Sequence, residues 1–570
     1  MDRIIAQALV IGAERVSAWA DLLDSINIFP VADGDTGRNL KISLAPLRGL
    51  AAGREKTIHR LLINARGNSG NIAARFFSGL LTAGSLETMP EAITLGRERA
   101  WTAVHDPKPG TMLTLFDALA EFMETSAVEP SERFASRVVS RLEDAVRSTP
   151  DLLPKLKEAG VVDSGALGMF IFFEGFFNAL AGTAGRQRPV TAVFNGMLSI
   201  SPSYEIEDEN GYCLDITLDG RAGRENVLYK LSRIGESVVV IPGEEYVKVH
   251  LHAGDAEKVR RSMASMAGIV RWSDDDLAEQ VHEFKRQGMR QAIHIMTDAA
   301  GSITRDDSRT YGMTLLDSYV TVGDLSAPET YMLPHDVYAL MRKGVKATTS
   351  QASEFERGEL YRSVTSRHER VLYLCVGSAF TGNYDAACRW KMENDPTGRF
   401  IILDTGAASG RLGSIALAAA AYSNKTDDPD AVVEFAKKTI ERCSEYLFID
   451  SLKYLAAGGR LSKTQALFGN MLGMKPVVTP TADGVKKAGV VKNLDEQLAF
   501  ALERLASPAA PGSRPFIMLQ FTDNRSLVED AILPEIAKRY PGAEIKIQPL
   551  SLTTGVHAGP GTWSIAFIPE

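Results

Sequence analysis

The period of the hydrophobic pattern changes near residue 185, and this change most limits the folds that the 570 residues can adopt. From residue 1 to about 183, apolar residues recur at helical spacing, with breaks at Gly, Pro, Asp and Asn. After a Gly/Arg/Pro stretch at 181–189, strand-like runs alternate with helical ones. Because a chain of this length is too long for one hydrophobic core, we expect several domains.

The pattern predicts a multidomain protein of three parts. We expect an all-α helical barrel or bundle at 1–183 and a small α+β domain at 190–288. Beyond them, apolar strands alternate with helices over 290–570, which predicts an α/β domain with a largely parallel sheet.

Charge and composition exclude several classes of protein. A formal net charge of -8, a pI near 5.8 and the lack of a basic stripe argue against a nucleic-acid partner. Four widely spaced cysteines and an N-terminus without signal-peptide features predict a cytoplasmic protein. The most apolar run, Ala166 to Gly182, is interrupted by Glu174 and follows a capping Asp-Ser-Gly, so we expect a buried helix and no transmembrane segment.

An acidic turn between Asn27 and Asn39 is the first candidate site. It carries Asp33 and Asp35 two positions apart, before a predicted helix. In an extended turn residues i and i+2 point the same way, so both carboxylates can bind a hard cation such as Mg²⁺. The alternative is an acidic capping turn with Thr36 as the N-cap.

Three further helices are predicted to begin in the same polar, Gly-containing way. Their free backbone N–H groups and dipoles favour anions. In an up-and-down bundle alternate helices begin at the same end, so these starts can converge on one triphosphate. Each start taken alone is equally explained as a helix cap. The residues that we select at these starts are Asn68, Ser69, Gly70, Gly110, Thr111 and Asp163.

The motifs NIFPVADGDTGRNL, ARGNSGN, PGTMLT and VVDSGALG make residues 1–183 resemble the ATP-binding subunit of dihydroxyacetone kinase. The resemblance to the ATP-binding subunit of bacterial fatty acid kinase is closer. It implies ATP and Mg²⁺ as cofactors, with Asp33 and Asp35 as magnesium ligands and Thr36 beside them in the catalytic group. The implied nucleotide site comprises Asn39 together with the residues selected at the three helix starts.

One position departs from the dihydroxyacetone kinase pattern. That family has a third metal-binding Asp a few residues before its Asp-Gly-Asp, where this sequence has Asn27. The fatty acid kinase subunit has the same Asn-x-Phe-Pro style, and an asparagine can offer a carbonyl oxygen instead. The sequence contains no Walker-type GxxxxGK[ST] loop.

A second candidate site lies in the middle domain. His250 and His252 alternate in a strand-like run, so both imidazoles project from one face, and Cys213 lies on another predicted strand. Two His and one Cys can bind Zn²⁺, with a fourth position supplied elsewhere. The alternative is a pair of surface-strand histidines. The middle domain of the fatty acid kinase subunit has a matching Gly-Tyr-Cys and His-x-His arrangement, which favours the metal.

Polar loops follow the predicted strands of the last domain, where ligands of open parallel sheets bind. Each loop alone is also explained as a turn. Together they make residues 290–570 similar to the DegV family of fatty-acid-binding proteins, despite departures at Ala299, Gly377 and Asn383. The resemblance implies a bound fatty acid, and Arg460 is a further candidate for the ligand or for docking. The residues implied for the carboxylate are Thr349, Ser350, Ser378, Thr381 and His557.

The combined resemblances predict an ATP-dependent kinase that phosphorylates a bound fatty acid to an acyl phosphate, for a downstream acyltransferase that uses acyl phosphates. A kinase for dihydroxyacetone or another small polyol is one alternative. A lipid carrier or sensor with a vestigial ATP site is another. The sequence leaves open whether the two sites meet within one chain or across a homodimer.

Overall fold

The computed structural model describes residues 2–220, 223–243, 245–285, 291–323, 325–457, 474–507 and 513–570. The chain divides into two compact units. The first comprises residues 1–287 with 355–366, and the second comprises residues 288–354 with 367–570. The predicted fold class is confirmed, with a helical part, a small α+β part and an α/β half.

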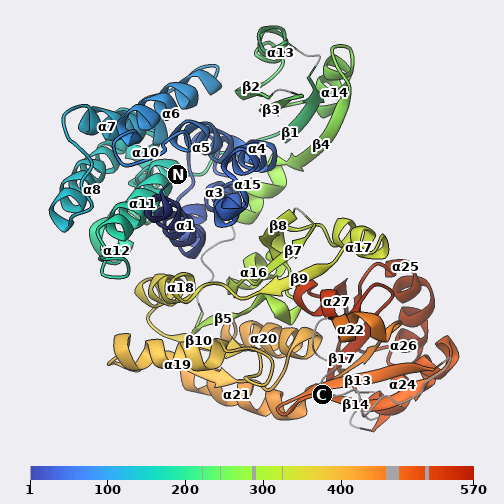
Figure 1. The fold of residues 1–570 in the computed structure, drawn as a ribbon. Helices are drawn as coiled ribbons and strands as arrows, with labels where there is room; N and C mark the ends of the chain where they lie inside the picture. Colours follow the sequence, from blue (N-terminus) through green and yellow to red (C-terminus); the bar gives the residue numbers. More distant parts are fainter. Residues whose placement is uncertain are drawn as a thin grey trace. The chain divides into compact units, whose positions relative to one another are not determined.

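The first unit begins with a helical bundle around α11 (Ser164–Leu180) (Figure 1). This helix is the most apolar run of the sequence, and Phe170, Phe172 and Phe173 on it have no exposed surface. Among the described residues no helix is both long and apolar enough to cross a bilayer. The other helices are α1 (Arg3–Ala18), α2 (Ala20–Ser25), α3 (Thr36–Leu44), α4 (Arg54–Asn64), α5 (Gly67–Leu80), α6 (Met89–Ala103), α7 (Met112–Glu124), α8 (Glu132–Arg147), α9 (Thr149–Leu152), α10 (Pro154–Ala159) and α12 (Val190–Val193), with the 3₁₀-helix η1 (Ala45–Ala52).

A four-stranded antiparallel sheet completes the first unit. Its strand order is β2-β3-β1-β4, and the central strand β3 is buried along its whole length. The apolar side chains of α13 and α14 join those of the strands in one core. The elements are β1 (Tyr212–Asp219), α13 (Arg224–Leu231), β2 (Glu236–Pro242), β3 (Tyr246–Ala253), α14 (Ala256–Ala264), β4 (Ile269–Asp276) and α15 (Leu277–Lys285).

The second unit contains three sheets, so the prediction of one largely parallel sheet is wrong in part. The sheet ordered β11-β10-β5-β6 is parallel, as predicted. In the six-stranded sheet β14-β13-β12-β17-β15-β16, however, only β15 and β16 pair in parallel, and the sheet β8-β7-β9 is antiparallel. Apolar strands look alike in sequence whether their neighbours run parallel or antiparallel, so periodicity could not separate these cases.

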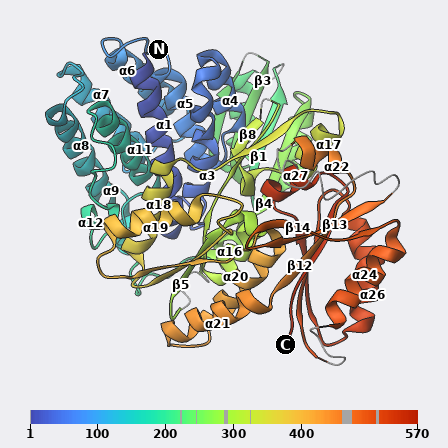
Figure 2. The ribbon, with the colours of Figure 1, turned by 60° about the horizontal axis from the view of Figure 1, so that its bottom comes forward.

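Helix α20 (Ser409–Ser423) forms a common core with the parallel sheet and the six-stranded sheet. Its small residues permit close approach, because a Cβ on Gly413 would lie 2.1 Å from the carbonyl oxygen of Gly301. A Cβ on Gly410 would lie 2.2 Å from Gln520 Oε1. On the opposite face of the six-stranded sheet, α24 (Leu494–Ala506) and α26 (Leu533–Arg539) cover a second core (Figure 2).

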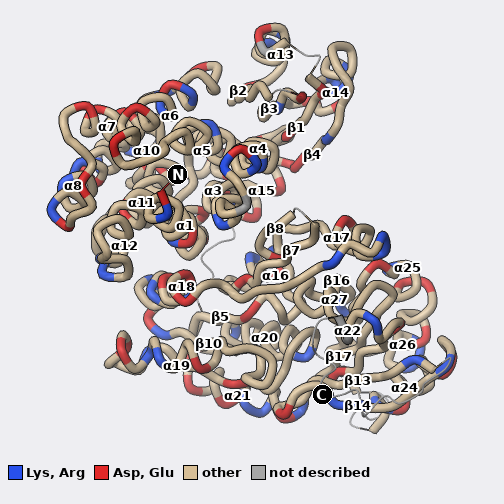
Figure 3. Tube along the Cα trace, viewed as in Figure 1, with Lys and Arg blue, Asp and Glu red and all other residues tan. Residues whose placement is uncertain are grey.

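The remaining elements of the second unit have the following bounds. The strands are β5 (His294–Asp298), β6 (Thr314–Leu316), β7 (Tyr319–Val322), β8 (Leu325–Pro328), β9 (Ala347–Ser350), β10 (Val371–Cys375), β11 (Phe400–Asp404), β12 (Ser444–Phe448), β13 (Lys475–Thr481), β14 (Gly484–Val491), β15 (Phe516–Phe521), β16 (Glu544–Pro549) and β17 (Trp563–Ile568). The helices are α16 (Arg305–Tyr311), α17 (Pro334–Arg342), α19 (Asn383–Asn394), α21 (Pro429–Arg442), α22 (Leu452–Ala457), α25 (Arg525–Leu527) and α27 (Leu552–Ala558). Lys, Arg, Asp and Glu are interspersed along both units (Figure 3).

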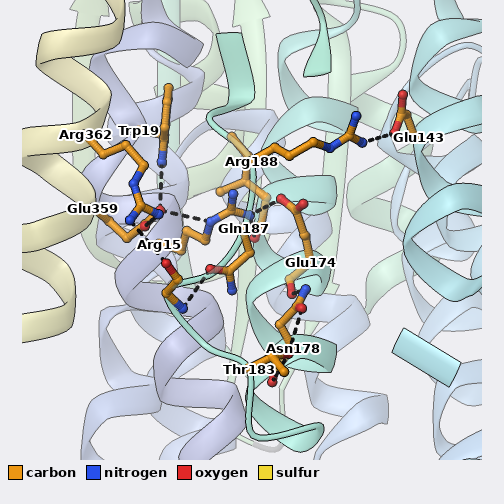
Figure 4. A network of polar contacts seen from close by, with 12 residues as sticks. Arg15, Trp19, Glu143, Glu174, Asn178, Thr183, Gln187, Arg188, Glu359 and Arg362 are labelled. Carbon is orange, nitrogen blue, oxygen red and sulfur yellow. Dashed lines mark hydrogen bonds and ion pairs between the residues drawn. The ribbon is translucent and has the colours of Figure 1, made fainter. Parts of the chain in front are cut away.

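One helix departs from the predicted order of domains. Helix α18 (Glu354–Arg367) follows β9 in the sequence, yet its residues 355–366 belong to the first unit. Arg15 on α1 is fully buried and pairs with Glu174 on α11 and with Glu359 on α18, at 3.0 Å from the latter (Figure 4). Trp19 Nε1 donates to the same Glu359 oxygen at 3.3 Å.

A second contact holds the same helix one turn earlier. Glu356 accepts hydrogen bonds from Ser17 Oγ at 2.7 Å and from Arg48 Nη1 at 2.6 Å. Both glutamates of α18 are almost completely buried. Because buried charges are stable only when they are paired, these contacts fix α18 against α1.

We expect Glu359→Ala to lower the free energy of opening of α18 by about 3 kcal/mol, because it leaves a buried guanidinium with one counter-charge. Hydrogen–deuterium exchange of the α18 amides measures this change. Glu434→Ala on α21 is the matched control, because its ion pair with Lys437 is exposed and contributes about 1 kcal/mol at most. Equal protection of α18 in both variants would contradict the assignment.

Candidate functional site

The candidate site is a cavity of about 710 Å³ in the first unit. All four predicted helix starts reach it, and so do both strands that carry the Cys/His cluster. The sequence predictions treated these as two separate sites, whereas the structure brings them into one cavity. The predicted residues that line it are Asn27, Asp33, Asp35, Thr36, Asn68, Ser69, Thr111, Asp163, Cys213, His250 and His252.

The acidic turn is shaped by a glycine and held by Asn27. Gly34 has φ 62°, a conformation that favours glycine, and the flanking Asp33 and Asp35 are 9% and 7% exposed. The Asn27 amide donates to Asp33, while its Oδ1 accepts from Thr36 Oγ at 2.9 Å and from Ser164 Oγ at 3.0 Å. Asn27 therefore ties the acidic turn to the start of α11, and its carbonyl oxygen already has two hydroxyl partners.

Asp24 is a residue that the sequence analysis missed. Its Oδ1 accepts from the backbone N–H groups of Gly37 at 2.6 Å and Arg38 at 3.1 Å, so it caps α3 from α2. The alternative in which Thr36 is the N-cap is wrong, because Asp35 occupies that position and Thr36 is the first helical residue. Burial raises the pKa of Asp24 to about 7, although the Arg38 charge opposes the shift. No local spacing links Asp24 to this helix start.

The first turn of α5 and the facing helix α3 leave two buried polar atoms available. Gly67 has φ 59°, and a Cβ there would lie 2.0 Å from Asn39 Nδ2. Asn39 Nδ2 and Ser69 Oγ are buried, and neither forms a hydrogen bond with any residue that the structure describes. Such atoms are costly unless a ligand or water meets them. Ser69 lines the cavity, whereas Asn39 backs the loop and Gly70 packs on Ser43.

The other two helix starts are capped by the residues that the sequence selected. Thr111 is the N-cap of α7 and accepts from Leu113 N at 3.4 Å, whereas the neighbouring Gly110 does not line the cavity. Asp163 is the N-cap of α11 and accepts from Ala166 N at 2.7 Å. Burial raises the pKa of Asp163 to about 7.

The cavity therefore concentrates acidic groups away from water. Burial raises the pKa of Asp33 well above its usual value, and repulsion by Asp35 adds to the shift. An oxygen-preferring cation such as Mg²⁺ would relieve both effects, because it neutralises the carboxylates and replaces lost hydration. The residues present thus fit a magnesium ion at Asp33 and Asp35.

The Cys/His cluster forms on one face of β1 and β3. The strands are antiparallel with Cys213 opposite His252, and the potential ligand atoms of Cys213, His250 and His252 all lie within 4.8 Å of one another. His250 Nε2 is buried and makes no hydrogen bond with a described residue. Three such donors beside an open cavity fit a zinc ion with a free fourth position.

Protonation states in the cluster also fit a metal. Burial and the charge of the neighbouring His250 together lower the pKa of His252 to about 3, so its imidazole is neutral and can ligate. Burial also raises the pKa of the Cys213 thiol well above its usual value, with the Asp35 and Asp215 charges adding to the shift. Zinc binding at Cys213 therefore displaces a proton.

Strand β2 closes another side of the cavity. Val104, at the end of α6, bridges Val239, and the N–H of His105 donates to the carbonyl of Val238 at 3.0 Å. Residues 235–238 of the middle domain line the cavity together with His105 and Lys108. Lys108 belongs to the predicted helix start before α7, whereas residues 235–238 and His105 carry no sequence motif and were not predicted.

In the second unit the structure brings two of the predicted carboxylate-binding residues into contact. Thr349 Oγ lies 3.0 Å from His557 Nε2, which joins β9 to α27. Ser378 instead donates to Asp404 at 2.5 Å and is exposed, as is Ser350. Thr381 Oγ accepts from Asn383 N at 3.3 Å.

The placement of two predicted groups bears on their roles. The Asp404 charge beside Ser378 disfavours a second carboxylate there, so the Thr349–His557 pair fits an acyl head group better than Ser378 does. Arg460 lies outside the described residues.

Three protein-family descriptions match the chain. A DAK2 domain matches residues 30–178, the middle domain of proteins like the A component of fatty acid kinase matches residues 209–284, and the DegV family, described as uncharacterised, matches residues 292–570. The chain therefore joins a DAK2 domain and a middle domain of the fatty acid kinase type to a DegV-family domain.

Curated relatives include uncharacterised proteins of two staphylococci. One from Staphylococcus saprophyticus is 31% identical over 318 residues, which cover 49% of this chain and 56% of that protein. One from Staphylococcus aureus is 29% identical over 333 residues, covering 51% and 58% respectively. This chain thus spans only a little over half the length of the curated relatives it matches.

Solved structures similar to the chain include two DegV proteins described as binding fatty acids. The protein of Thermus thermophilus is 23% identical with a TM-score of 0.45, and covers 48% of this chain and 99% of its own. The protein of Bacillus subtilis is 20% identical with a TM-score of 0.44, and covers 49% and 99%.

We expect Asn27→Ala to lower the free energy of unfolding by about 2 kcal/mol, because the buried hydroxyls of Thr36 and Ser164 lose their shared acceptor. Urea denaturation followed by circular dichroism measures the change. Asn394→Ala is the control, since this exposed amide donates to the Trp390 carbonyl of its own helix and its loss should cost no more than about 0.5 kcal/mol. If both variants have the same free energy of unfolding, Asn27 does not tie the acidic turn to the start of α11 as the structure indicates.

Proposed function

We propose that this chain, in which a DAK2 domain and a middle domain of the fatty acid kinase type precede a DegV-family domain, transfers phosphate from ATP to a fatty acid. In this reaction a carboxylate oxygen of the acid attacks the γ-phosphorus of ATP. A new P–O bond forms, the bond to the β–γ bridging oxygen breaks, and ADP leaves. The products are an acyl phosphate and ADP, and no proton is transferred.

The observation that carries this proposal is the convergence of the acidic turn and three helix starts on one cavity. Phosphoryl transfer asks the protein mainly to position the reactants and to stabilise the charge on the transferred group. Helix N-termini supply N–H donors for phosphate oxygens. Asp33 and Asp35 would hold Mg²⁺, which when bound would neutralise phosphate charge, and a carboxylate nucleophile needs no general base.

The Cys/His cluster would add a second cation to the same cavity. Cys213, His250 and His252 would hold zinc, which when bound supplies positive charge and an open coordination position. The chain's own part is to keep the His252 imidazole neutral and both imidazoles on one strand face.

The second half of the proposal assigns the fatty acid to the DegV-family domain. Its support is the Thr349–His557 pair, because a hydroxyl and an imidazole can both donate to a carboxylate. Burying a long acyl chain is favourable by about 0.8 kcal/mol per methylene, so a lipid substrate needs a protein that presents it. We place the reaction in the cytoplasm, with an acyltransferase that consumes the acyl phosphate.

Substitution of the acidic turn tests the kinase proposal. We expect Asp33→Asn and Asp35→Asn each to lower the rate of ADP formation with ATP, Mg²⁺ and oleate at least about 100-fold, because a metal-held charge is lost from the transition state. Oleate binding should be unchanged. Asp274→Asn, an exposed carboxylate on β4, is the matched control.

The same assay separates the alternatives. Turnover with dihydroxyacetone but not with oleate would identify a small-polyol kinase. Oleate binding without turnover in the unsubstituted protein would identify a carrier or sensor.

Metal analysis tests the cluster. We expect the purified chain to carry one zinc per molecule by inductively coupled plasma mass spectrometry, and Cys213→Ser to lose it, because two histidines alone bind zinc far more weakly. Cys388→Ser is the control, since this partly exposed thiol lies in the second unit. Full zinc content in Cys213→Ser would refute the site.

A further inference from the structure

Asp215 touches both halves of the candidate site. Its Oδ1 lies 3.4 Å from His250 Nδ1, and its Oδ2 accepts from the backbone N–H of Gly67 at 3.1 Å. Asn71 on α5 also approaches Oδ1, at 3.4 Å through Nδ2. One largely buried carboxylate, 13% exposed, thus lies between the Cys/His cluster and the loop that opens α5.

The register of β1 and β3 explains why Asp215 lies beside the Cys/His cluster. On β1, Asp215 follows Cys213 by two positions, so both side chains lie on the same face. Asp215 is also directly opposite His250 across the β1–β3 pair, where neighbouring Cβ atoms lie about 5 Å apart. The face that carries the cluster therefore necessarily presents this carboxylate to His250.

A buried lysine fixes the sheet in this position. Lys248 on β3 donates through Nζ to the carbonyls of Ile63, at 3.2 Å, and Ala65, at the C-terminal end of α4. The Lys248 side chain thus lies at the negative end of the α4 dipole, and the Asp215 carboxylate lies at the positive end of the α5 dipole. Two opposite charges on adjacent strands hold the sheet against two consecutive helix ends.

We propose that Asp215 is a positioning residue that couples metal binding at Cys213, His250 and His252 to nucleotide binding at the loop of Gly67 and Ser69. The inference rests on the proposed function, because it requires a nucleotide at this loop. It adds that the affinity for the metal and the affinity for the nucleotide depend on each other.

The coupling follows from the two acceptor oxygens. When His250 ligates through Nε2, its Nδ1 carries a proton and donates to Asp215, which fixes the ring and the carboxylate together. The second carboxylate oxygen of Asp215 then accepts from the Gly67 N–H, and this hydrogen bond fixes the first turn of α5. Nucleotide phosphates at that turn require the same loop geometry, so each ligand prepares the site of the other.

Calorimetry of the full-length chain tests this coupling. Affinity for the non-hydrolysable analogue AMP-PNP with excess Mg²⁺ is measured with and without zinc, and zinc affinity is measured with and without AMP-PNP. We expect each ligand to tighten the other by the same factor, within the range of about 5- to 150-fold typical of coupled sites. Asp274→Asn should keep that factor.

In Asp215→Asn the factor should fall close to one, while both ligands still bind separately. The amide replaces one acceptor with a donor and so cannot serve His250 and Gly67 together. An unchanged factor in this variant would overturn the proposal. If the variant does not fold, the measurement on the unsubstituted chain tests the proposal. Zinc and AMP-PNP affinities that do not depend on each other in that chain would also overturn the coupling.

The outcomes separate this inference from the proposed function. If AMP-PNP does not bind the unsubstituted chain at all, the kinase proposal and the coupling both fail. If AMP-PNP binds equally with and without zinc, only the coupling fails.

Discussion

The burial of carboxylates around one cavity is the constraint on which the first unit depends. Asp33, Asp35 and Asp163 are each less than a tenth exposed, and burial raises the pKa of Asp33 and Asp163. Each anion is therefore stable only with donors or a cation nearby. Asn27 and the backbone N–H groups of α11 supply the donors, and Arg38 Nη2, 3.7 Å from Asp35 Oδ2, supplies one positive charge. The magnesium ion that we propose would neutralise the remaining negative charge.

Helix starts supply hydrogen-bond donors to several of the acidic groups around the site. Asp24, Asp163 and Asp215 each accept from backbone N–H groups at a helix start, so three helices are held in place by the same kind of contact. Lys248 makes the complementary contact at a helix C-terminus. Burial lowers the pKa of Lys248 to about 7, although the Asp215 charge opposes the shift. The site is thus assembled from helix starts together with the turn that carries Asp33 and Asp35 and the segment 104–108.

Local sequence patterns predicted the acidic turn and the Cys/His cluster, but they did not predict that both line one cavity. The spacing of Asp33 and Asp35, and of His250 and His252, each fixes two side chains on one face within a few residues, so sequence reasoning identified them. Which strand lies opposite β3, and which helix start lies beside the sheet, depends on contacts far apart in the sequence. Asp215 had a signal, since it follows Cys213 by two positions, but its partner Gly67 is 148 residues away. The pairing of Ser378 with Asp404 was hidden for the same reason.

Helix α18 shows a different limit of prediction from the sequence. Its Glu356 and Glu359 are nearly completely buried, although charged residues in a polar helix predict a solvent-facing surface. Their partners Arg15, Ser17 and Arg48, more than 300 residues earlier, together with Arg362 on the same helix, make burial tolerable. Helix α18 therefore cannot leave the first unit without depriving the buried Arg15 of one of its two counter-charges, although only residues 351–353 separate it in sequence from strand β9 of the second unit.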